Sequence, residues 1–306
     1  MNYDIIGDIH GQAAKLRGML SRLGYRERAG AHRHPFRTAV FLGDFIDRGP
    51  EQREVFDLVR RMVDAGAAKA VMGNHEFNAI GWASPDPASP GEYLRLHNAS
   101  NTRQHAEFLS QFGEGRAVHR EAIAWFKTLP LYLDLGEIRV VHAWWHQPYA
   151  DHAASDMARN AAVSESYLLN AFEEGSEHFK AVEGLLKGLE IRLAAEHAIR
   201  DHGGITRQNV RIKWWQRGPG ALSEFAILPT AYDGKLPDIS VPENLPLGLE
   251  GDAPVFIGHY WLSGIPKPLT PKLACLDYSI GSGGPLVAYR WEGEPDLNEQ
   301  GFICQH

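Results

Sequence analysis

Nine polar residues that follow short apolar runs have the types and spacing needed for metal-assisted chemistry. Taken singly they have ordinary explanations, because an aspartate after a strand often forms a turn and a lone histidine is often structural. Together they supply carboxylate, imidazole and amide ligands, a set that suits manganese, iron or zinc better than calcium, which takes mainly oxygen. The nine residues are Asp8, His10, Asp44, Asp47, Arg48, Asn74, His75, His142 and His259. We therefore expect a centre of two divalent metal ions, with manganese favoured and iron or zinc as alternatives.

Six of the nine would hold the ions, and Asp44 is the candidate for the ligand that they share. Two cations about 3.5 to 4 Å apart repel each other, and a shared anionic ligand offsets this repulsion. Asp8 and His10 are assigned to the first ion, since Gly7 and Gly11 would let the segment bend so that both face one site. The second ion would share Asp44 with the first. Its other ligands would be Asn74, His142 and His259, which follow three different apolar runs. Such a centre would lower the pKa of a bridging water, and the metal-bound hydroxide would attack a phosphate ester.

Three further residues would act on the phosphate ester itself. His75 is assigned as the general acid that protonates the leaving alkoxide, with Asp47 orienting its ring and stabilising its protonated form. Arg48 directly follows Asp47, and its planar guanidinium suits two phosphate oxygens better than a lysine would. A surface ion pair is the alternative explanation for Arg48. We therefore expect His75 and Asp47 to be catalytic and Arg48 to bind substrate.

The elements that would position these residues repeat one pattern. Three apolar runs, at 3–6, 38–42 and 68–72, each end in glycine plus a polar residue and lead into helical sequence. Strands that alternate with helices predict an α/β fold with mainly parallel strands, whose C-terminal ends meet at one edge of the sheet. Further strands are expected in a hairpin at 131–135 and 138–141, and at 255–257, 273–276 and 285–291. The last three would form a second sheet or extend the first.

Length and composition describe one globular domain with an insertion. The 306 residues allow a sizeable core, and 44% hydrophobic with 23% charged residues is ordinary for a soluble chain. Residues 81–118 lose the alternation of strands and helices, so we expect a surface excursion there. Residues 151–251 read as helices followed by loops rich in glycine and proline. The predicted organisation is a single domain, 1–306, with a cap or insertion at 151–251.

Composition also excludes several classes of protein. Cys275 and Cys304 are too few for a disulfide framework, which fits a reducing compartment. No stretch is apolar enough to span a membrane and the N-terminus shows no export signal, so we expect a cytoplasmic protein without a membrane partner. A net charge of -7 without a basic run argues against a nucleic-acid polymer as partner.

The strings GDIHG, GDFIDRG and GNHE, with later strand-terminal HA and GH, resemble those of the calcineurin-like metallophosphoesterases. The DRG and the E after GNH resemble the phosphoprotein phosphatase branch, which includes bacterial Ser/Thr phosphatases and diadenosine tetraphosphatases. The resemblance is strong over the first third of the chain and holds only at points in the rest. It implies a four-layer α/β/β/α sandwich of two mixed sheets with a helical cap, and metal ions at the sheet edge. It also implies the ligand assignment given above and the pairing of Asp47 with His75.

A second string resembles a substrate-binding motif of bacterial members of that branch. These proteins carry a tryptophan followed two residues later by an arginine that grips the substrate phosphate, and Trp215 and Arg217 have this spacing. The resemblance implies that Arg217 binds substrate. The alternative is that Trp214 and Trp215 pack in the core or under the cap and that Arg217 is a solvated charge.

The chain departs from the family at three points that bear on substrate choice. The string after His259 lacks the second histidine of the family's GHxH, as it usually does in this branch, so the first metal would be held loosely and exchange. Trp144 and Trp145 stand where relatives have a glycine; they would narrow the pocket mouth, stack on an aromatic group, or pack under the cap. Near the C-terminus CLDYS replaces a family string closer to LDTG, which leaves a role for Tyr278 open.

These observations predict a metal-dependent phosphoric ester hydrolase with a phosphorylated substrate. The leading hypothesis is a phosphatase of phosphoproteins or small phosphomonoesters. The alternative is a diadenosine or other dinucleoside polyphosphate hydrolase. A third hypothesis, a phosphate-binding module without turnover, is disfavoured because every expected ligand is present together with His75.

Overall fold

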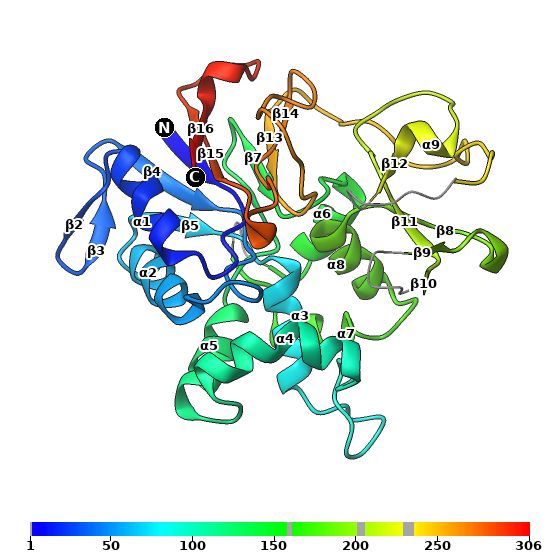
Figure 1. The fold of residues 1–306 in the computed structure, drawn as a ribbon, viewed down its shortest axis with the longest axis horizontal. Helices are drawn as coiled ribbons and strands as arrows, with labels where there is room; N and C mark the ends of the chain where they lie inside the picture. The colour runs from blue at the N-terminus through cyan, green and yellow to red at the C-terminus, as the bar shows by residue number, and fades with distance from the viewer. Residues whose placement is uncertain (1, 158–160, 201–205, 229–235) are drawn as a thin grey trace.

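Two mixed β-sheets form the centre of the molecule. The computed structural model describes residues 2–157, 161–200, 206–228 and 236–306. In the first sheet β1, β4 and β5 are parallel, while β15 is antiparallel to both β1 and β16. Its strands, in spatial order, are β16 (Phe302–Gln305), β15 (Leu286–Trp291), β1 (Asn2–Ile6), β4 (Arg37–Phe41) and β5 (Ala68–Ala70). Figure 1 shows this sheet beside the second one.

The second sheet contains the predicted hairpin and two of the later strands. Its order is β14 (Leu273–Cys275), β13 (Val255–Ile257), β7 (Arg139–Val141) and β6 (Tyr132–Asp134). The first three strands are parallel and β6 is antiparallel to β7. The sequence left open whether the late strands form a second sheet or extend the first. The structure does both, because β13 and β14 join the second sheet and β15 joins the first.

Side chains of the strands alternate between two hydrophobic cores. Ile5 and Val40 pack between the sheets with Phe256, whereas their neighbours Ile6 and Phe41 belong to the core shared with the helices. Successive side chains of a strand point to opposite faces, so strands buried on both faces read as continuous apolar runs. This burial on both faces produces the four-layer α/β/β/α sandwich that the family resemblance implied.

Helices cover the outer face of each sheet. Figure 1 shows α1 (Ala13–Arg22) and α2 (Gln52–Asp64) beside the first sheet, and α6 (Gln147–Ala154) and α8 (Glu177–Lys187) beyond the second. The buried side chains of α2 follow helical spacing, with Val55, Leu58, Val59 and Met62 on one face. Their burial holds α2 against the first sheet, and the chain leaves the helix at Gly66 in a left-handed conformation.

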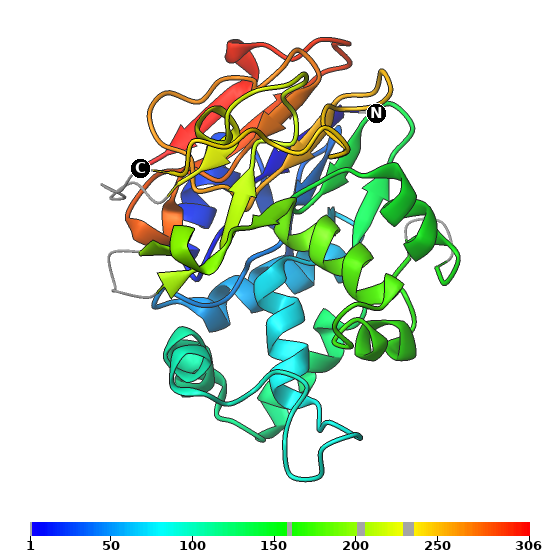
Figure 2. The same ribbon diagram turned by 90° about the vertical axis from the view of Figure 1, so that its right-hand side faces the viewer.

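A third group of helices lies below the sheets, as Figure 2 shows. It contains α3 (Asn74–Ala83), α4 (Ala99–Phe112), α5 (Ala117–Phe126) and α7 (Glu165–Asn170). Residues 81–118 were expected to form a surface excursion, but part of this segment is buried. One face of α4 is buried, through His105, Phe108 and Phe112, and the Phe112 ring packs edge to face on Phe56 of α2 with ring centres 5.5 Å apart.

Residues 151–251, which we name the cap region, contain helices first and then short strands that had not been expected there. A three-stranded antiparallel sheet contains β8 (Glu190–Arg192), β11 (Asn209–Ile212) and β12 (Ala226–Ile227). Val210, Ile212 and Phe225 belong to a hydrophobic cluster separate from the two cores of the sandwich. The remaining short elements are β2 (Arg26–Arg28), β3 (Ala31–Arg33), β9 (Ile199–Arg200), β10 (Thr206–Arg207), α9 (Leu222–Phe225) and three 3-10 turns, η1 (Ala195–His197), η2 (Ile280–Ser282) and η3 (Glu299–Gly301). Among the described residues, no helix is long and apolar enough to cross a membrane.

Candidate active site

The six predicted metal ligands converge where the C-terminal ends of five strands meet. Strand β1 leads to Asp8 and His10, and β4 leads to Asp44. Strands β5, β7 and β13 deliver the other three, which are Asn74, His142 and His259. All six side chains are buried. The parallel strands thus bring together residues that lie up to 251 positions apart, as in the contact of the His259 backbone N–H with Asp8.

Six residues of these loops have a positive φ angle although none is glycine. The φ angles are 43° for His10, 52° for Asp44, 63° for Asp47, 70° for Arg48, 71° for His259 and 36° for Trp261. Each such residue costs on the order of 1–2 kcal/mol, so the conformation persists only where the surroundings enforce it. The concentration of this strain at one place indicates a functional site.

Glu76 provides part of that enforcement. One of its carboxylate oxygens accepts hydrogen bonds from the backbone N–H groups of Asp44 and Gly73, at 2.8 and 3.0 Å, and the other accepts from Phe45 at 2.8 Å. The buried carboxylate therefore joins the loops after β4 and β5. Burial, followed by the nearby charge of Asp44, raises the pKa of Glu76 to about 7.

The ligand atoms form two overlapping groups that share Asp44. Atoms of His10, Asp44 and His75 lie within 4.8 Å of one another, and so do atoms of Asp44, His142 and His259. One oxygen of Asp44 is 3.6 Å from His10 Nε2, and the other is 3.4 Å from His142 Nε2. Asp44 can therefore offer one oxygen to each of two cations, which is the geometry of a bridging ligand.

Asp8 and Asn74 both contact His259 in the loop after β13. Asn74 Oδ1 lies 3.1 Å from His142 Nε2 and 2.8 Å from His259 Nδ1. Asp8 accepts the backbone N–H of His259 at 3.1 Å, and a Cβ added to Gly258 would lie 2.0 Å from Asp8 Oδ1. The loop after β13 is thus shaped around the Asp8 carboxylate.

The hydrogen bonds of two histidines show that the donor set fits divalent cations. His10 Nδ1 donates to the Ile46 carbonyl at 2.9 Å, and His142 Nδ1 donates to the Leu42 carbonyl at 2.6 Å. A neutral ring with this tautomer has its lone pair on Nε2, which faces the Asp44 carboxylate, so a cation placed between them would satisfy both acceptors. A backbone carbonyl that fixes the tautomer of a ligating histidine is the usual arrangement around protein metals.

The pKa values of two histidines beside Asp44 also show that the buried carboxylates favour a positive charge near His142. Burial would lower the pKa of His142, but Asp44 and then Asp8 raise it to about 10. Burial, with the positive charge of Arg48, instead lowers the pKa of His10 to about 3. His10 is therefore neutral and available as a ligand, while the carboxylates beside His142 attract a proton or another cation.

Asp47 and His75 form the predicted pair, and a third residue joins them. His75 Nδ1 lies 2.5 Å from Asp47 Oδ2, and His75 Nε2 lies 3.8 Å from Asp44. The other Asp47 oxygen is 3.0 Å from Nδ1 of His105, which the sequence analysis did not single out. Burial alone would raise the pKa of Asp47, but the hydrogen bonds from His105 and His75 hold it below its usual value. Asp47 is therefore a carboxylate between two imidazoles.

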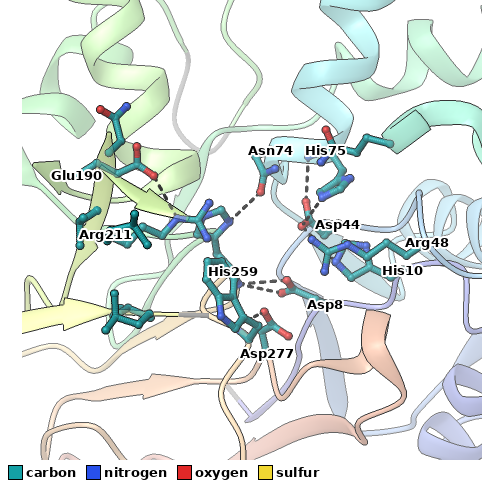
Figure 3. Close-up of a pocket in the computed structure, with 17 residues that line it drawn as sticks. Asp8, His10, Asp44, Arg48, Asn74, His75, Glu190, Arg211, His259 and Asp277 are labelled. Atoms are coloured by element: carbon teal, nitrogen blue, oxygen red, sulfur yellow. Dashed lines mark hydrogen bonds and ion pairs between the residues drawn. The ribbon is translucent and has the colours of Figure 1, made fainter. Parts of the chain in front are cut away.

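The ligand groups open into a cavity of about 450 Å³. Arg48, Asp8 and Asp277 line it on the side of the sandwich, and Arg211 and Glu190 face them from the cap sheet (Figure 3). The cap wall also contains apolar side chains from Ile199, Val210, Ile227 and Leu228. The site therefore has a charged floor at the strand ends and a mixed wall from the cap.

Arg217 does not line this cavity. Its guanidinium donates to the Leu249 carbonyl at 2.5 Å, and its side chain lines two other surface hollows. Trp214 is fully buried, with its indole N–H 3.0 Å from the Tyr260 hydroxyl, and Trp215 packs edge to face on the Tyr260 ring. The packing alternative therefore describes both tryptophans. The arginine of the cap that faces the ligands is Arg211, six residues earlier.

Two other open questions are decided by burial. Trp144 and Trp145 are 2% and 4% exposed and belong to the main core, so they have a packing role and do not line the cavity. Tyr278 packs in the core between the sheets, and its hydroxyl accepts the Lys267 N–H at 3.2 Å. Its neighbour Asp277 lines the cavity instead and accepts the Trp261 and Ser279 N–H groups. The CLDYS string therefore does reach the cavity, but through Asp277 and not through Tyr278.

The fold and the shared ligand groups define a metallophosphoesterase. The sequence model of the family described as calcineurin-like phosphoesterase matches residues 1–170, more than half of the chain, and the chain therefore belongs to this family. The same fold occurs in a protein serine/threonine phosphatase from Saccharomyces cerevisiae with similarity to human phosphatase PP5. That structure covers 99% of this chain and 78% of its own, with a TM-score of 0.52 at 14% identity.

Curated relatives carry a more specific name. The chain is 34% identical over 146 residues to the bis(5'-nucleosyl)-tetraphosphatase PrpE [asymmetrical] of Bacillus subtilis (strain 168), which covers 47% of this chain and 57% of that protein. It is 32% identical over 144 residues to the protein of the same name from Oceanobacillus iheyensis, covering 47% and 55%. The matched segment thus spans little more than half of each relative.

Proposed function

We propose that this chain hydrolyses phosphate esters or anhydrides of small molecules, using two divalent cations at the strand ends. The observation that carries the proposal is the position of Asp44, whose two oxygens face two separate groups of buried ligands. A binding module would not need a shared carboxylate at this place. The family also supports the proposal, because its members are phosphoesterases.

Each ion has a set of ligands in this proposal. The first would be held by Asp8, His10 and Asp44, and the second by Asp44 and three neutral side chains, Asn74, His142 and His259. The bound ions would neutralise phosphate charge and acidify a water molecule for attack. Manganese is the proposed ion, since the mixture of nitrogen and oxygen ligands suits it, with iron or zinc as alternatives.

Three further residues would act on the substrate, one as a proton donor and two as phosphate ligands. His75 would pass a proton from Nε2 to the leaving oxygen, because its Nδ1 is engaged by Asp47. Arg48 is exposed at the cavity, next to His10, and its guanidinium would bind phosphate oxygens. Arg211 would bind a second phosphate from the cap side, a role that the sequence analysis gave to Arg217.

A dinucleoside polyphosphate is the substrate that we propose, ahead of phosphoproteins and phosphomonoesters. Two observations support it. The relatives at 32–34% identity are named bis(5'-nucleosyl)-tetraphosphatases. The cavity also places apolar side chains of the cap beside the charged floor, which suits a base attached to a phosphate chain better than a phosphoserine.

A substrate panel tests this proposal. The protein would be loaded with manganese and given diadenosine tetraphosphate, ATP, AMP, a phosphoserine peptide and p-nitrophenyl phosphate, with products separated by chromatography. We expect the highest kcat/KM on diadenosine tetraphosphate, with AMP and ATP as products if the cut is asymmetrical and two ADP if it is symmetrical. Preference for the peptide or a monoester would instead support the leading sequence hypothesis. A wild type as inert as His75→Ala and Asn74→Ala on every compound would indicate a binding module.

A further inference from the structure

His105 is a buried histidine of α4 whose position is tied to Asp47. It is 0% exposed, and its Nδ1 lies 3.0 Å from Asp47 Oδ1. Helix α4 lies in the layer below the sheets, outside the strand-end loops that supply the ions' ligands (Figure 2). His105 is therefore a link from this separate layer to the residue that orients His75.

The contacts of His105 show which of its two ring nitrogens is the donor to Asp47. Asp47 is ionised, so Nδ1 must be the donor in this contact. Within the described part of the chain Nε2 has no hydrogen-bond partner, and the rings of Phe108 and Trp82 lie 4.7 and 5.5 Å from the imidazole. His105 therefore gives one N–H, from Nδ1, to the Asp47 carboxylate, while its Nε2 is buried away from solvent.

The two oxygens of Asp47 are divided between the two histidines. Oδ2 faces His75 at 2.5 Å and Oδ1 faces His105 at 3.0 Å. With both oxygens engaged, the carboxylate cannot rotate about its Cβ–Cγ bond without breaking one contact. Asp47 Oδ2 therefore stays in line with His75 Nδ1, and the opposite nitrogen, Nε2, stays aimed at the cavity.

We propose that His105 is a positioning residue for proton transfer by His75, acting through Asp47. The inference rests on the proposed function, since it concerns the same site. Partners of a catalytic group that lie one contact further out commonly change activity by about 10- to 100-fold when they are removed. A purely structural role would be different, because the loss of a buried hydrogen bond lowers stability and affects all substrates alike.

The experiment compares two aryl phosphates that differ in their need for a proton. The nitrophenolate of p-nitrophenyl phosphate leaves readily without one, whereas the phenolate of phenyl phosphate is far more basic. With manganese bound, we expect His105→Gln to lower kcat on phenyl phosphate about tenfold or more beyond its effect on p-nitrophenyl phosphate, with KM changed by less than about twofold. Glutamine places its amide where Nε2 stands and leaves Asp47 Oδ1 without its donor.

Matched variants separate positioning from packing. His105→Asn places an amide nitrogen where Nδ1 stands, so it should restore the wild-type ratio of the two kcat values to within about threefold. His105→Phe is a second variant without the donor that keeps the ring contacts with Phe108 and Trp82, and either donor-free variant suffices. His119→Gln removes another buried imidazole of the same layer, which packs on Phe108, and should leave the ratio unchanged.

The outcomes distinguish this inference from the proposed function. A wild-type protein that turns over neither aryl phosphate nor diadenosine tetraphosphate would overturn the proposed function. An active wild type whose kcat ratio is unchanged in the donor-free variants would overturn the role of His105 alone. Melting temperatures of all variants show whether a loss of kcat is accompanied by a loss of stability.

Discussion

Arg211 holds its guanidinium carbon 4.2 Å from the centre of the Trp261 ring. The arginine comes from β11 of the cap and the tryptophan from the loop after β13, and both line the cavity. Glu190 of β8 lies 3.3 Å from the Nε of Arg211, so an ion pair and a ring together orient the guanidinium. A cation fixed in this way can bind a phosphate at a defined distance from the strand ends.

Replacement of Arg211 should therefore weaken substrate binding. We expect Arg211→Ala to lower kcat/KM on diadenosine tetraphosphate by about tenfold or more, because a hydrogen bond to a charged group contributes roughly 1.5–3 kcal/mol. The loss should be smaller on p-nitrophenyl phosphate, which has one phosphate. Arg192→Ala is the matched control, since Arg192 lies on β8 with its side chain exposed. A loss in Arg217→Ala equal to that in Arg211→Ala would restore the assignment made from the sequence.

Removal of the ions should abolish turnover and lower the melting temperature. Ligands that bind only the native state stabilise it by about 2.7 kcal/mol at a hundred times Kd. Asp44→Asn removes the carboxylate shared by both ligand groups, so this variant should show no shift in melting temperature on addition of manganese. Asp57→Asn, on the face of α2 that pairs with Arg53, should respond as the wild type does. Metal content by mass spectrometry gives the identity and number of the ions, and a full complement in Asp44→Asn would contradict the bridging role.

His119 of α5 should make the protein less stable in mild acid. Burial, together with the charge of His105, lowers its pKa below the ordinary value of 6.5. The unfolded state then binds more protons, so the stabilisation is present above pH 6.5 and is lost as the pH falls below it. Urea unfolding between pH 7.5 and 5 should show a steeper loss for the wild type than for His119→Phe. Parallel curves for the two proteins would contradict this expectation.

Asp4 should be important for stability and not for chemistry. It is fully buried on β1 and lies 3.0 Å from Arg37 of β4 and 2.9 Å from Arg290 of β15, so it joins three strands. Asp4→Ala would leave two guanidinium groups without their shared partner, at a cost of about 3 kcal/mol in the free energy of unfolding. Breaking the exposed pair of Arg17 and Glu54 should cost less than about 1 kcal/mol. Urea unfolding measures both, and equal losses would contradict the burial argument.

The loops of the first eighty residues could be predicted because their chemistry is local. Glycines, aspartates and histidines follow strong apolar runs there, and parallel strands necessarily bring their C-terminal ends to one edge. Strand β13 was also predicted before His259, although 184 residues separate that histidine from His75. The parallel strands and the convergence of the candidate ligands could thus be predicted from local patterns, whereas the four-layer sandwich was implied only by the family resemblance.

Residues that reach the site through packing could not be derived in this way. His105 contacts Asp47 only because α4 packs on α2, and no local signal distinguishes it from the other histidines of its segment. Arg211 faces the cavity because of the pairing of β8, β11 and β12, which are two to four residues long and too short to show a period. Asp277 lines the cavity, whereas its neighbour Tyr278 packs in the core between the sheets. The sequence pattern could not show which of the two adjacent residues faces the cavity.

The cap has its own hydrophobic cluster, distinct from both cores of the sandwich. Its strands can therefore exchange cavity-facing side chains without disturbing the layers that fix the ligand atoms. Selection for a new leaving group would act first on β8, β11 and β12, while the strand-end loops are constrained by strained backbone and shared carboxylates. Related proteins should then differ more in the residues of β8, β11 and β12 than in those of the strand-end loops.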